Sequence, residues 1–292
     1  MSSPAETDHD EMKLSFYQTK PFIKTMVFLT LLTIILLPGI FFLSARFFAI
    51  GKTATNAFKA PRRVLVVFAH TDDEVTNSGL LRHWANQGSQ ITLMTLTDGA
   101  ANPQSDLSVC NAQDTITDCR MRELRDSARI LGIRNVRTPL IPDSKLMEHL
   151  TRASKLVGEE IASLRPDAIL TMEPSGLNGL SDHRAAFLSV ALSLQEQPHQ
   201  SRAFLSVLPP PFAWILPSRI PADFSGSNKV FPLSDSLIEI KAADAAAHRS
   251  QSATINGLTL GLGARKLFQW INFETYNVVE ADDLQHYINA AR

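Results

Sequence analysis

Short apolar runs alternate with amphipathic stretches from about residue 62 onward. The run Arg63–Ala69 (RVLVVFA) is too short for a helix and is typical of a strand buried on both faces. A helical pattern follows over Glu74–Asn86, with Gly88 as its stop signal. A second apolar run at Gln90–Leu96 then completes a strand–helix–strand unit.

The same alternation continues to about residue 196. Strands that alternate with helices build a mostly parallel sheet with helices on both faces, so the chain predicts one α/β domain. Beyond residue 196 a proline-rich stretch weakens the pattern, and the C-terminal end is ambiguous. We expect further strands at 136–140 and 167–172, and further helices at 120–131, 145–164, 182–194 and 234–248.

An uncharged apolar segment precedes this domain. Met26 to Ala45 contains about 20 residues, which is roughly the helix length needed to cross the hydrocarbon core of a bilayer. A signal peptide is the alternative, but its apolar region is only about 7–15 residues long. We therefore expect a polar tail at 1–25, a transmembrane helix at 26–45, a linker at 46–61 and the α/β domain at 62–292.

The sequence predicts a single-pass membrane location but does not set the orientation. Basic residues flank the apolar segment at similar distances on both sides, so the positive-inside rule is close to a tie. Cys110 and Cys119 share one polar loop, and their spacing allows either a disulfide, which favours an oxidising compartment, or two reduced thiols. The flanking basic residues are Lys13, Lys20 and Lys24 before the segment and Arg46, Lys52 and Lys59 after it.

Charge excludes one class of partner. The chain has 28 basic and 29 acidic residues, which gives a formal net charge of −1. A protein that binds nucleic acid through its overall charge carries a basic surplus. We therefore expect no nucleic-acid partner.

The loop after the first strand carries a dense set of polar side chains, His70-Thr71-Asp72-Asp73-Glu74. Ligands of such folds bind at the carboxyl ends of the strands, where this loop lies. Three successive acids are costly to hold together unless a cation neutralises them. Thr71 and Glu74 also fit a helix capping box, but capping leaves His70 and the third acid unexplained. An imidazole beside carboxylates is a zinc-compatible pair, so we favour a metal site.

A third metal ligand is available at the strand-to-helix junction after residue 172. His183 lies there in the first turn of the predicted helix, and two such junctions on neighbouring parallel strands face each other. A lone histidine at a helix start is usually a solvated polar residue, so the weight of His183 comes from this pairing. Further along, Lys241 and His248 are seven residues apart and share one face of a predicted helix.

Five motifs follow one another between about Arg63 and Gln251: H-x-D-D-E, R-x-x-E-L, P-D, G-x-x-D-H and K-x-x-x-x-x-x-H-x-S-Q. In this order they resemble the zinc-dependent de-N-acetylases, the family of N-acetylglucosaminyl-phosphatidylinositol de-N-acetylase and the bacterial LmbE-like deacetylases. The resemblance implies a Rossmann-like domain that removes the N-acetyl group from an N-acetylglucosamine-type sugar in a glycolipid or glycoconjugate. An anchor beside this domain would suit a lipid-linked substrate.

The resemblance also implies roles for individual residues. One Zn²⁺ per chain is expected on His70, Asp73 and His183, with Fe²⁺ as an alternative divalent metal. Asp72 is expected to act as the general base on a zinc-activated water. His248 is the expected proton donor, because the unperturbed pKa of an imidazole lies near neutrality. Arg120 and Asp143 are the expected substrate-binding residues.

Two departures from the family pattern keep other interpretations open. Thr71 replaces a usual proline, and Leu180 stands where a histidine commonly assists the tetrahedral intermediate. The change at Leu180 favours, as one alternative, a catalytically impaired membrane-tethered protein that still binds a sugar. A second alternative interprets His70-x-Asp72 and a distant histidine as the triad of a non-haem Fe(II) oxygenase. That class usually carries its triad on a β-sandwich, which this alternation of strands and helices does not predict.

Overall fold

In the computed structural model, the chain forms two units, Met1–Ser44 and Ala45–Arg292. The larger unit contains the whole α/β domain predicted from the sequence. The finer domain boundaries at residues 25, 45 and 61 stay predictions. The structure describes residues 24–30, 32–33, 36–37, 39–40, 43–44, 55–196, 199–208, 228–258 and 263–292.

A seven-stranded sheet of order β3-β2-β1-β4-β5-β7-β6 forms the centre of the larger unit. Its first five strands are parallel, in the 3-2-1-4-5 order of a doubly wound fold, while β7 runs antiparallel to both β5 and β6. The predicted α/β class with a mostly parallel sheet is confirmed. The strands are β1 Arg63–Phe68, β2 Gln90–Thr95, β3 Asn135–Arg137, β4 Ala168–Met172, β5 Arg202–Val207, β6 Lys229–Pro232 and β7 Phe273–Glu280.

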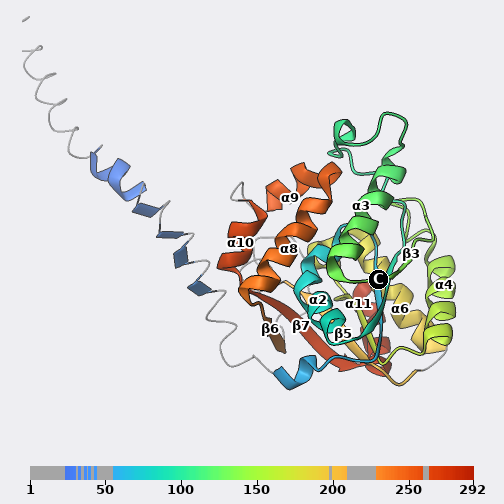
Figure 1. Cartoon of the computed structure of the whole chain (residues 1–292). Helices are drawn as coiled ribbons and strands as arrows, with labels where there is room; N and C mark the ends of the chain where they lie inside the picture. The colour runs from blue at the N-terminus through green and yellow to red at the C-terminus, as the bar shows by residue number, and fades with distance from the viewer. Residues whose placement is uncertain are drawn as a thin grey trace, which may run out of the picture. The chain divides into compact units, whose positions relative to one another are not determined.

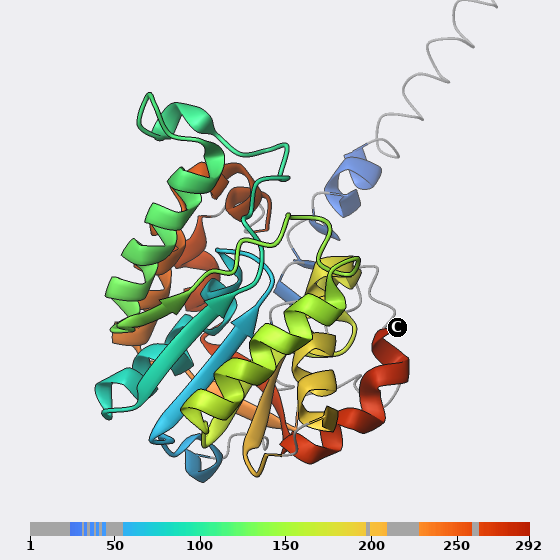
Figure 2. The same ribbon diagram turned by 90° about the vertical axis from the view of Figure 1, so that its right-hand side faces the viewer.

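Helices cover both faces of this sheet (Figures 1 and 2). Side chains alternate between the faces along each strand, so Leu65 and Val67 of β1 join one hydrophobic cluster while Val64 and Val66 join the other. The first cluster packs against α4, α6 and α11, and the second against α2, α3 and α8. These helices are α2 Ser78–Asn86, α3 Ile116–Leu131, α4 Leu150–Leu164, α6 Ser181–Glu196, α8 Asp235–Ala247 and α11 Ile288–Ala291.

Shorter helices complete the described chain. They connect the larger elements and leave the layers unchanged. The α-helical pieces are α5 Gly176–Gly179, α9 Ser252–Leu258 and α10 Ala264–Trp270, and the 3-10 turns are η1 Thr55–Phe58, η2 Asp73–Asn77, η3 Leu107–Val109, η5 Arg249–Gln251 and η6 Ala281–Tyr287.

Tertiary contacts move several element ends from their predicted places. The helix expected at 120–131 begins four residues earlier, because Thr115 and Asp118 form a reciprocal capping box. The helix expected at 145–164 begins only at Leu150, since the amides of Ser144 and Leu146 donate to a distant carboxylate, that of Asp182. The strand expected at 136–140 is confined to β3, and the C-terminal strand β7 was not predicted.

The predicted single-pass membrane location is wrong. Among the described residues, no helix combines the length and the apolar character that a membrane span requires. Several positions of the predicted span 26–45, and much of the predicted linker, lie outside the described residues.

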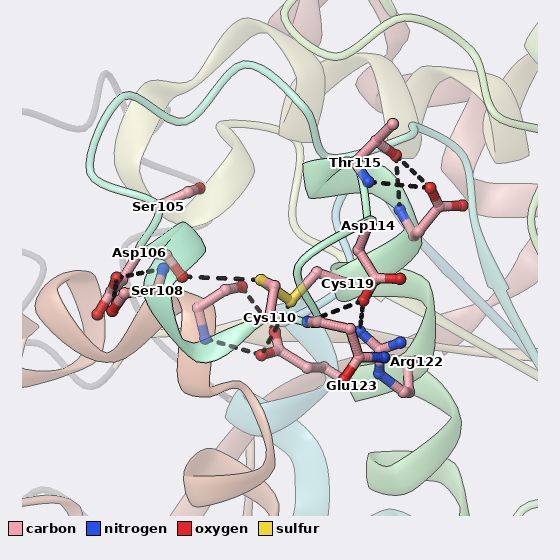
Figure 3. Close-up of a disulfide and its surroundings, with 12 residues drawn as sticks. Ser105, Asp106, Ser108, Cys110, Asp114, Thr115, Cys119, Arg122 and Glu123 are labelled. Carbon is pink, nitrogen blue, oxygen red and sulfur yellow. Dashed lines mark hydrogen bonds and ion pairs between the residues drawn. A yellow bond between two sulfur atoms is a disulfide. The ribbon is translucent and has the colours of Figure 1, made fainter.

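Cys110 and Cys119 form a disulfide between the loop after β2 and the first turn of α3 (Figure 3). The bond ties this loop to the helix that carries Arg120. The loop also pairs with the chain beyond α8, because the amide of Asp106 donates to the carbonyl of Ser250 at 2.8 Å. Of the two states that the sequence left open, the structure contains the bonded one.

Removing this disulfide is expected to lower the free energy of unfolding by about 2–3 kcal/mol, because the bond closes a loop of about ten residues in the unfolded chain. Urea unfolding of the double variant Cys110→Ser/Cys119→Ser measures the loss. Reductant should destabilise the wild type by a similar amount and leave the double variant unaffected. Equal stability of the two proteins, with or without reductant, would show that the thiols are not bonded.

Candidate active site

The two predicted junctions lie side by side at the carboxyl edge of the sheet. β1 and β4 are hydrogen-bonded neighbours, and the chain turns in opposite directions after them in the 3-2-1-4-5 order. Ligands of doubly wound folds bind at this switch point. His70 and Asp73 follow β1, and His183 lies in the first turn of α6, which follows β4. The topology therefore brings residues 113 positions apart into one site.

The three predicted ligands converge within a few ångströms. His70 Nδ1 lies 3.0 Å from His183 Nε2, and His183 Nε2 lies 3.2 Å from Asp73 Oδ1. His70 Nδ1 and Asp73 Oδ2 are 3.7 Å apart. Two ligands that each lie about 2.0–2.1 Å from a tetrahedral zinc ion are about 3.3–3.4 Å from one another. The separations among these nitrogen and oxygen atoms therefore fit one small cation.

The orientation of His183 is set by the backbone. Its Nδ1 lies 2.9 Å from the carbonyl oxygen of Gly176, so the ring donates a hydrogen bond from Nδ1. The lone pair of Nε2 is then available to coordinate a metal. Gly176 has a φ of +73°, and a Cβ at this position would lie 2.7 Å from the Cβ of His183. Only glycine combines this conformation with so close an approach.

Two carboxylates orient His70 from the opposite side of its ring. His70 Nε2 lies 3.1 Å from Asp143 Oδ1 and 3.7 Å from Asp182 Oδ2. The second oxygen of Asp143 accepts the amide of Ala101 at 2.9 Å. Both oxygens of Asp143 thus have protein partners, and this geometry makes it an orienting group for His70. Its predicted contact with substrate stays a prediction.

The charges of Asp73 and the two histidines shift one another's pKa values. Burial raises the pKa of Asp73, but the charge of His183 and its hydrogen bond outweigh burial and hold this pKa far below its usual range. Burial lowers the pKa of His70, but hydrogen bonds to the surrounding carboxylates raise it well above the usual value. The pKa of His183 is also raised, against burial, by the charge of Asp73. The Asp73 carboxylate is therefore held anionic beside two nitrogen ligands.

Asp72 points to a different partner from Asp73. Its Oδ1 accepts a hydrogen bond from Nη2 of Arg120 at 2.9 Å, and Arg120 Nη1 donates to the carbonyl of Gly99 at 2.6 Å. The side chain of Asp72 is 20% exposed and that of Arg120 only 2%. The buried Arg120 therefore fixes the position of Asp72. Asp72 is more accessible than the adjacent Asp73. Substrate binding by Arg120 stays a prediction.

Capping does not explain the acids of this loop. The hydroxyl of Thr71 is buried and has no hydrogen-bond partner among the described residues, so the capping box that the sequence allowed is not formed. Glu74 instead accepts hydrogen bonds from Ser127 and His248, each at 2.6 Å. The Thr71 hydroxyl therefore does not cap the helix as predicted.

His248 lies outside the metal cluster. Its side chain is 0% exposed, and its Nε2 is bonded to the equally buried Glu74. Burial lowers the pKa of His248, but the charge and hydrogen bond of Glu74 outweigh burial and raise this pKa to about 9. Leu180, three residues before His183, is 49% exposed. Proton donation by His248 stays a prediction, although its placement argues against direct contact with a substrate.

The described residues hold two further groups of possible metal ligands. His70, Asp143 and Asp182 form one, but they share the ring that already faces Asp73. Glu74, Asp244 and His248 form the other, which is fully buried and is occupied by hydrogen bonds as short as 2.6 Å. Both groups that contain His70 are partly exposed, and of these two the group of His70, Asp73 and His183 is the predicted ligand set.

Sequence reasoning missed the residues that orient the ligands. Asp182 directly precedes His183 in the D-H motif, but its role depends on the amides of Ser144 and Leu146, which lie about 37 residues away in the chain. The carbonyl of Gly176 leaves no side-chain signal. A glycine seven residues before a histidine was the one available hint.

A family model described as "PIG-L: GlcNAc-PI de-N-acetylase" matches residues 65–192. The "Probable N-acetyl-alpha-D-glucosaminyl L-malate deacetylase 2" of Bacillus cereus is 29% identical over 144 residues, which are 48% of this chain and 64% of that protein. The "1D-myo-inositol 2-acetamido-2-deoxy-alpha-D-glucopyranoside deacetylase" of Corynebacterium glutamicum is 30% identical over 141 residues, 41% of this chain and 49% of that protein. The chain thus spans about half to two thirds of the length of these relatives.

Solved structures agree on the fold. The N,N'-diacetylchitobiose deacetylase from Pyrococcus horikoshii superposes with a TM-score of 0.52 at 20% identity, covering 78% of this chain and 87% of that one. The teicoplanin deacetylase Orf2 superposes with a TM-score of 0.56 at 16% identity, covering 76% and 99%. At these identities the likeness concerns the fold alone. Together with the sequence matches and the order of the motifs, it leads to one conclusion: residues 65–192 of this chain are similar to the PIG-L/LmbE-like family of de-N-acetylases.

Proposed function

We propose that the chain is a metal-dependent hydrolase that removes the N-acetyl group from an N-acetylglucosamine-type sugar. The convergence of His70 Nδ1, His183 Nε2 and Asp73 Oδ1 carries this proposal. Three protein ligands are the number found in catalytic zinc sites, which keep a further position for water or substrate. The proposal also draws on the printed activities of the relatives, which are deacetylases of acetylated glucosamine conjugates.

Zinc held by these three side chains would supply a water of lowered pKa and a Lewis acid for the amide carbonyl. Asp72 is the group that removes the proton of the attacking water, because it is the accessible acid beside the cluster. Arg120 holds Asp72 in place through its hydrogen bond to Oδ1. Water adds to the acetyl carbon, the carbon–nitrogen bond breaks, and acetate and a free amine are the products.

The departing amine needs a proton, and the structure favours Asp72 as its source. His248 is 0% exposed and is bonded to Glu74, whereas Asp72 has just received a proton beside the reacting carbon in the scheme above. If Asp72 serves first as base and then as acid, the proton taken from the water passes to the departing amine. We therefore assign both transfers to Asp72.

The substrate class follows from what the relatives share. Their printed names have an acetylated glucosamine in common, whereas the attached groups differ, malate in one and inositol in the other. We propose a glucosamine conjugate with an acetylated 2-amino group. The glycolipid form of this substrate stays a prediction.

Two observations bear on the alternatives. Fe(II) oxygenases usually carry their triad on a β-sandwich, whereas the described sheet is mostly parallel and is covered by helices, so we set this alternative aside. One observation still supports a sugar-binding protein without turnover: the apolar side chain of Leu180, three residues before His183, is exposed. An assay for acetate release from N-acetylglucosamine conjugates, with the zinc-loaded protein, decides between binding and turnover.

The ligand assignment predicts which variants lose metal. Asp73→Ala and His183→Ala should reduce zinc from about one ion per chain to a small fraction, because each removes one of three ligands. Asp72→Asn should retain zinc and lower kcat by about 10²-fold or more, the scale of a general base. Elemental analysis and an acetate assay measure the two effects. The matched control is Glu148→Gln, an exposed acid on another loop. Loss of zinc in Asp72→Asn, with zinc retained in Asp73→Ala, would contradict the assignment.

Gly176 should matter for metal binding although it offers no side chain. Gly176→Ala places a Cβ 2.7 Å from the His183 Cβ and 2.9 Å from the amide of Arg184, at a φ that costs L-residues about 1–2 kcal/mol. We expect His183 to move and zinc affinity to fall by about tenfold or more. Gly257→Ala is the control, since nothing lies within 4 Å of its added Cβ. Equal zinc affinity of the two variants would mean that Gly176 does not position His183.

A further inference from the structure

The candidate acids Asp72 and Asp73 lie at the start of a short turn between β1 and α2. Asp72 caps a five-residue 3-10 helix, η2, which begins with Asp73 and leads into α2. Asp72 forms no side-chain capping bond to this helix. Such a short turn is only weakly stable alone, so packing must fix its position.

The packing partner is one face of α8. Lys241, Asp244 and His248 follow one another at three and four residues, so they lie on the same side of this helix and its C-cap. All three are at most 5% exposed. They lie beyond residues 65–192, the part of the chain that the family model matches.

His248 binds the turn through Glu74, the residue directly after Asp73. Its Nε2 lies 2.6 Å from Glu74 Oε1, and the hydroxyl of Ser127 donates to the same oxygen at 2.6 Å. Glu74 and His248 are both 0% exposed in their side chains. A buried carboxylate needs a charged or hydrogen-bonding partner, so this contact holds Glu74 from the far side of the turn.

Lys241 binds the turn through its backbone. Its ammonium group donates to the carbonyls of Val75 at 2.6 Å and Thr76 at 2.8 Å. The same nitrogen lies 2.6 Å from Glu274 Oε1 of β7. Lys241 therefore links two carbonyls of η2 to the antiparallel strand β7.

The third contact reaches the start of α2. Asp244 Oδ2 accepts a hydrogen bond from the hydroxyl of Ser78 at 2.6 Å. Glu274, already held by Lys241, accepts the amides of Gly79 and Leu80 at 2.9 and 3.0 Å. The amide ends of α2 and the carbonyls of η2 are thus bound by one continuous buried network.

We propose that Lys241, Asp244 and His248 form a clamp that positions the turn bearing Asp72 and Asp73. None of the three contacts the metal cluster in the described residues, so they are positioning residues. The clamp acts through Glu74, Ser78 and the carbonyls of Val75 and Thr76. Sub-ångström placement of ligands and base matters, because displacements of about 1 Å can cost about 10²-fold in rate.

This inference rests on the proposed function for its effect on metal and turnover, but not for its effect on the turn itself. Hydrogen–deuterium exchange of the metal-free protein therefore tests the clamp independently. We expect His248→Leu and Lys241→Met to speed exchange of amides 72–80 by about tenfold or more. Glu239→Gln, on α8 but paired at the surface with Arg265, should leave exchange there unchanged. Unchanged exchange in both clamp variants would overturn the proposal.

Zinc titration then measures the consequence for the site. His248→Leu should bind zinc about 10–100-fold more weakly, as expected when a group that supports a ligand is lost, and should lower kcat with KM within about twofold. His248→Gln keeps a donor toward Glu74 and should recover most of the affinity. A loss of kcat with full zinc affinity and no recovery in His248→Gln would overturn positioning in favour of direct proton donation.

Two further outcomes separate the explanations. If His248→Leu does not fold, Ser127→Ala, which removes the other donor to Glu74, replaces it in both measurements. Two zinc ions per wild-type chain, with one lost in Asp244→Asn, would overturn the clamp and make the buried group a second metal site. Absence of zinc from the wild type would refute the proposed function, and the exchange measurement alone would then decide the clamp.

Discussion

The carboxylate of Asp73 is buried between two imidazole rings, and the rest of the site is arranged around that contact. His183 Nε2 lies 3.2 Å from Asp73 Oδ1, and the amide of His70 donates to Oδ2 at 2.8 Å. A buried carboxylate is stable only when paired, and two nitrogen ligands beside it create a place for a cation. The parallel order of β1 and β4 makes this contact possible, because it brings the two strand-to-helix junctions together at one edge of the sheet.

Support for this cluster comes from two directions. Asp143, Asp182 and the Gly176 carbonyl fix the rings of the two histidines from the side of β3 and β4. Arg120 contacts Asp72, and the α8 residues contact the η2 turn. Metal ligands generally need such outer partners to fix their tautomer and direction. The candidate ligands therefore lie at the carboxyl edge of the sheet, and the surrounding helices position them.

Much of the fold was predictable, because buried parallel strands appear as apolar runs and helices as periodic patterns. The candidate ligand set was also predictable, since His70, Asp73 and His183 stand at strand-to-helix junctions. The partners of Arg120, Asp143 and His248 were not, because each depends on contacts between distant segments. His248 illustrates the difference: helix periodicity placed it beside Lys241, but only tertiary structure shows its contact with Glu74. The apolar segment at 26–45 shows the converse, since composition alone suggested a membrane span that the described helices do not support.

One measurement tests the central claim directly: anomalous diffraction at the zinc edge from crystals of the zinc-loaded protein. The account predicts a single strong peak among His70, Asp73 and His183, with Asp72 adjacent and outside the ligand set. A peak among Glu74, Asp244 and His248 instead, or no peak near Asp73, would contradict it.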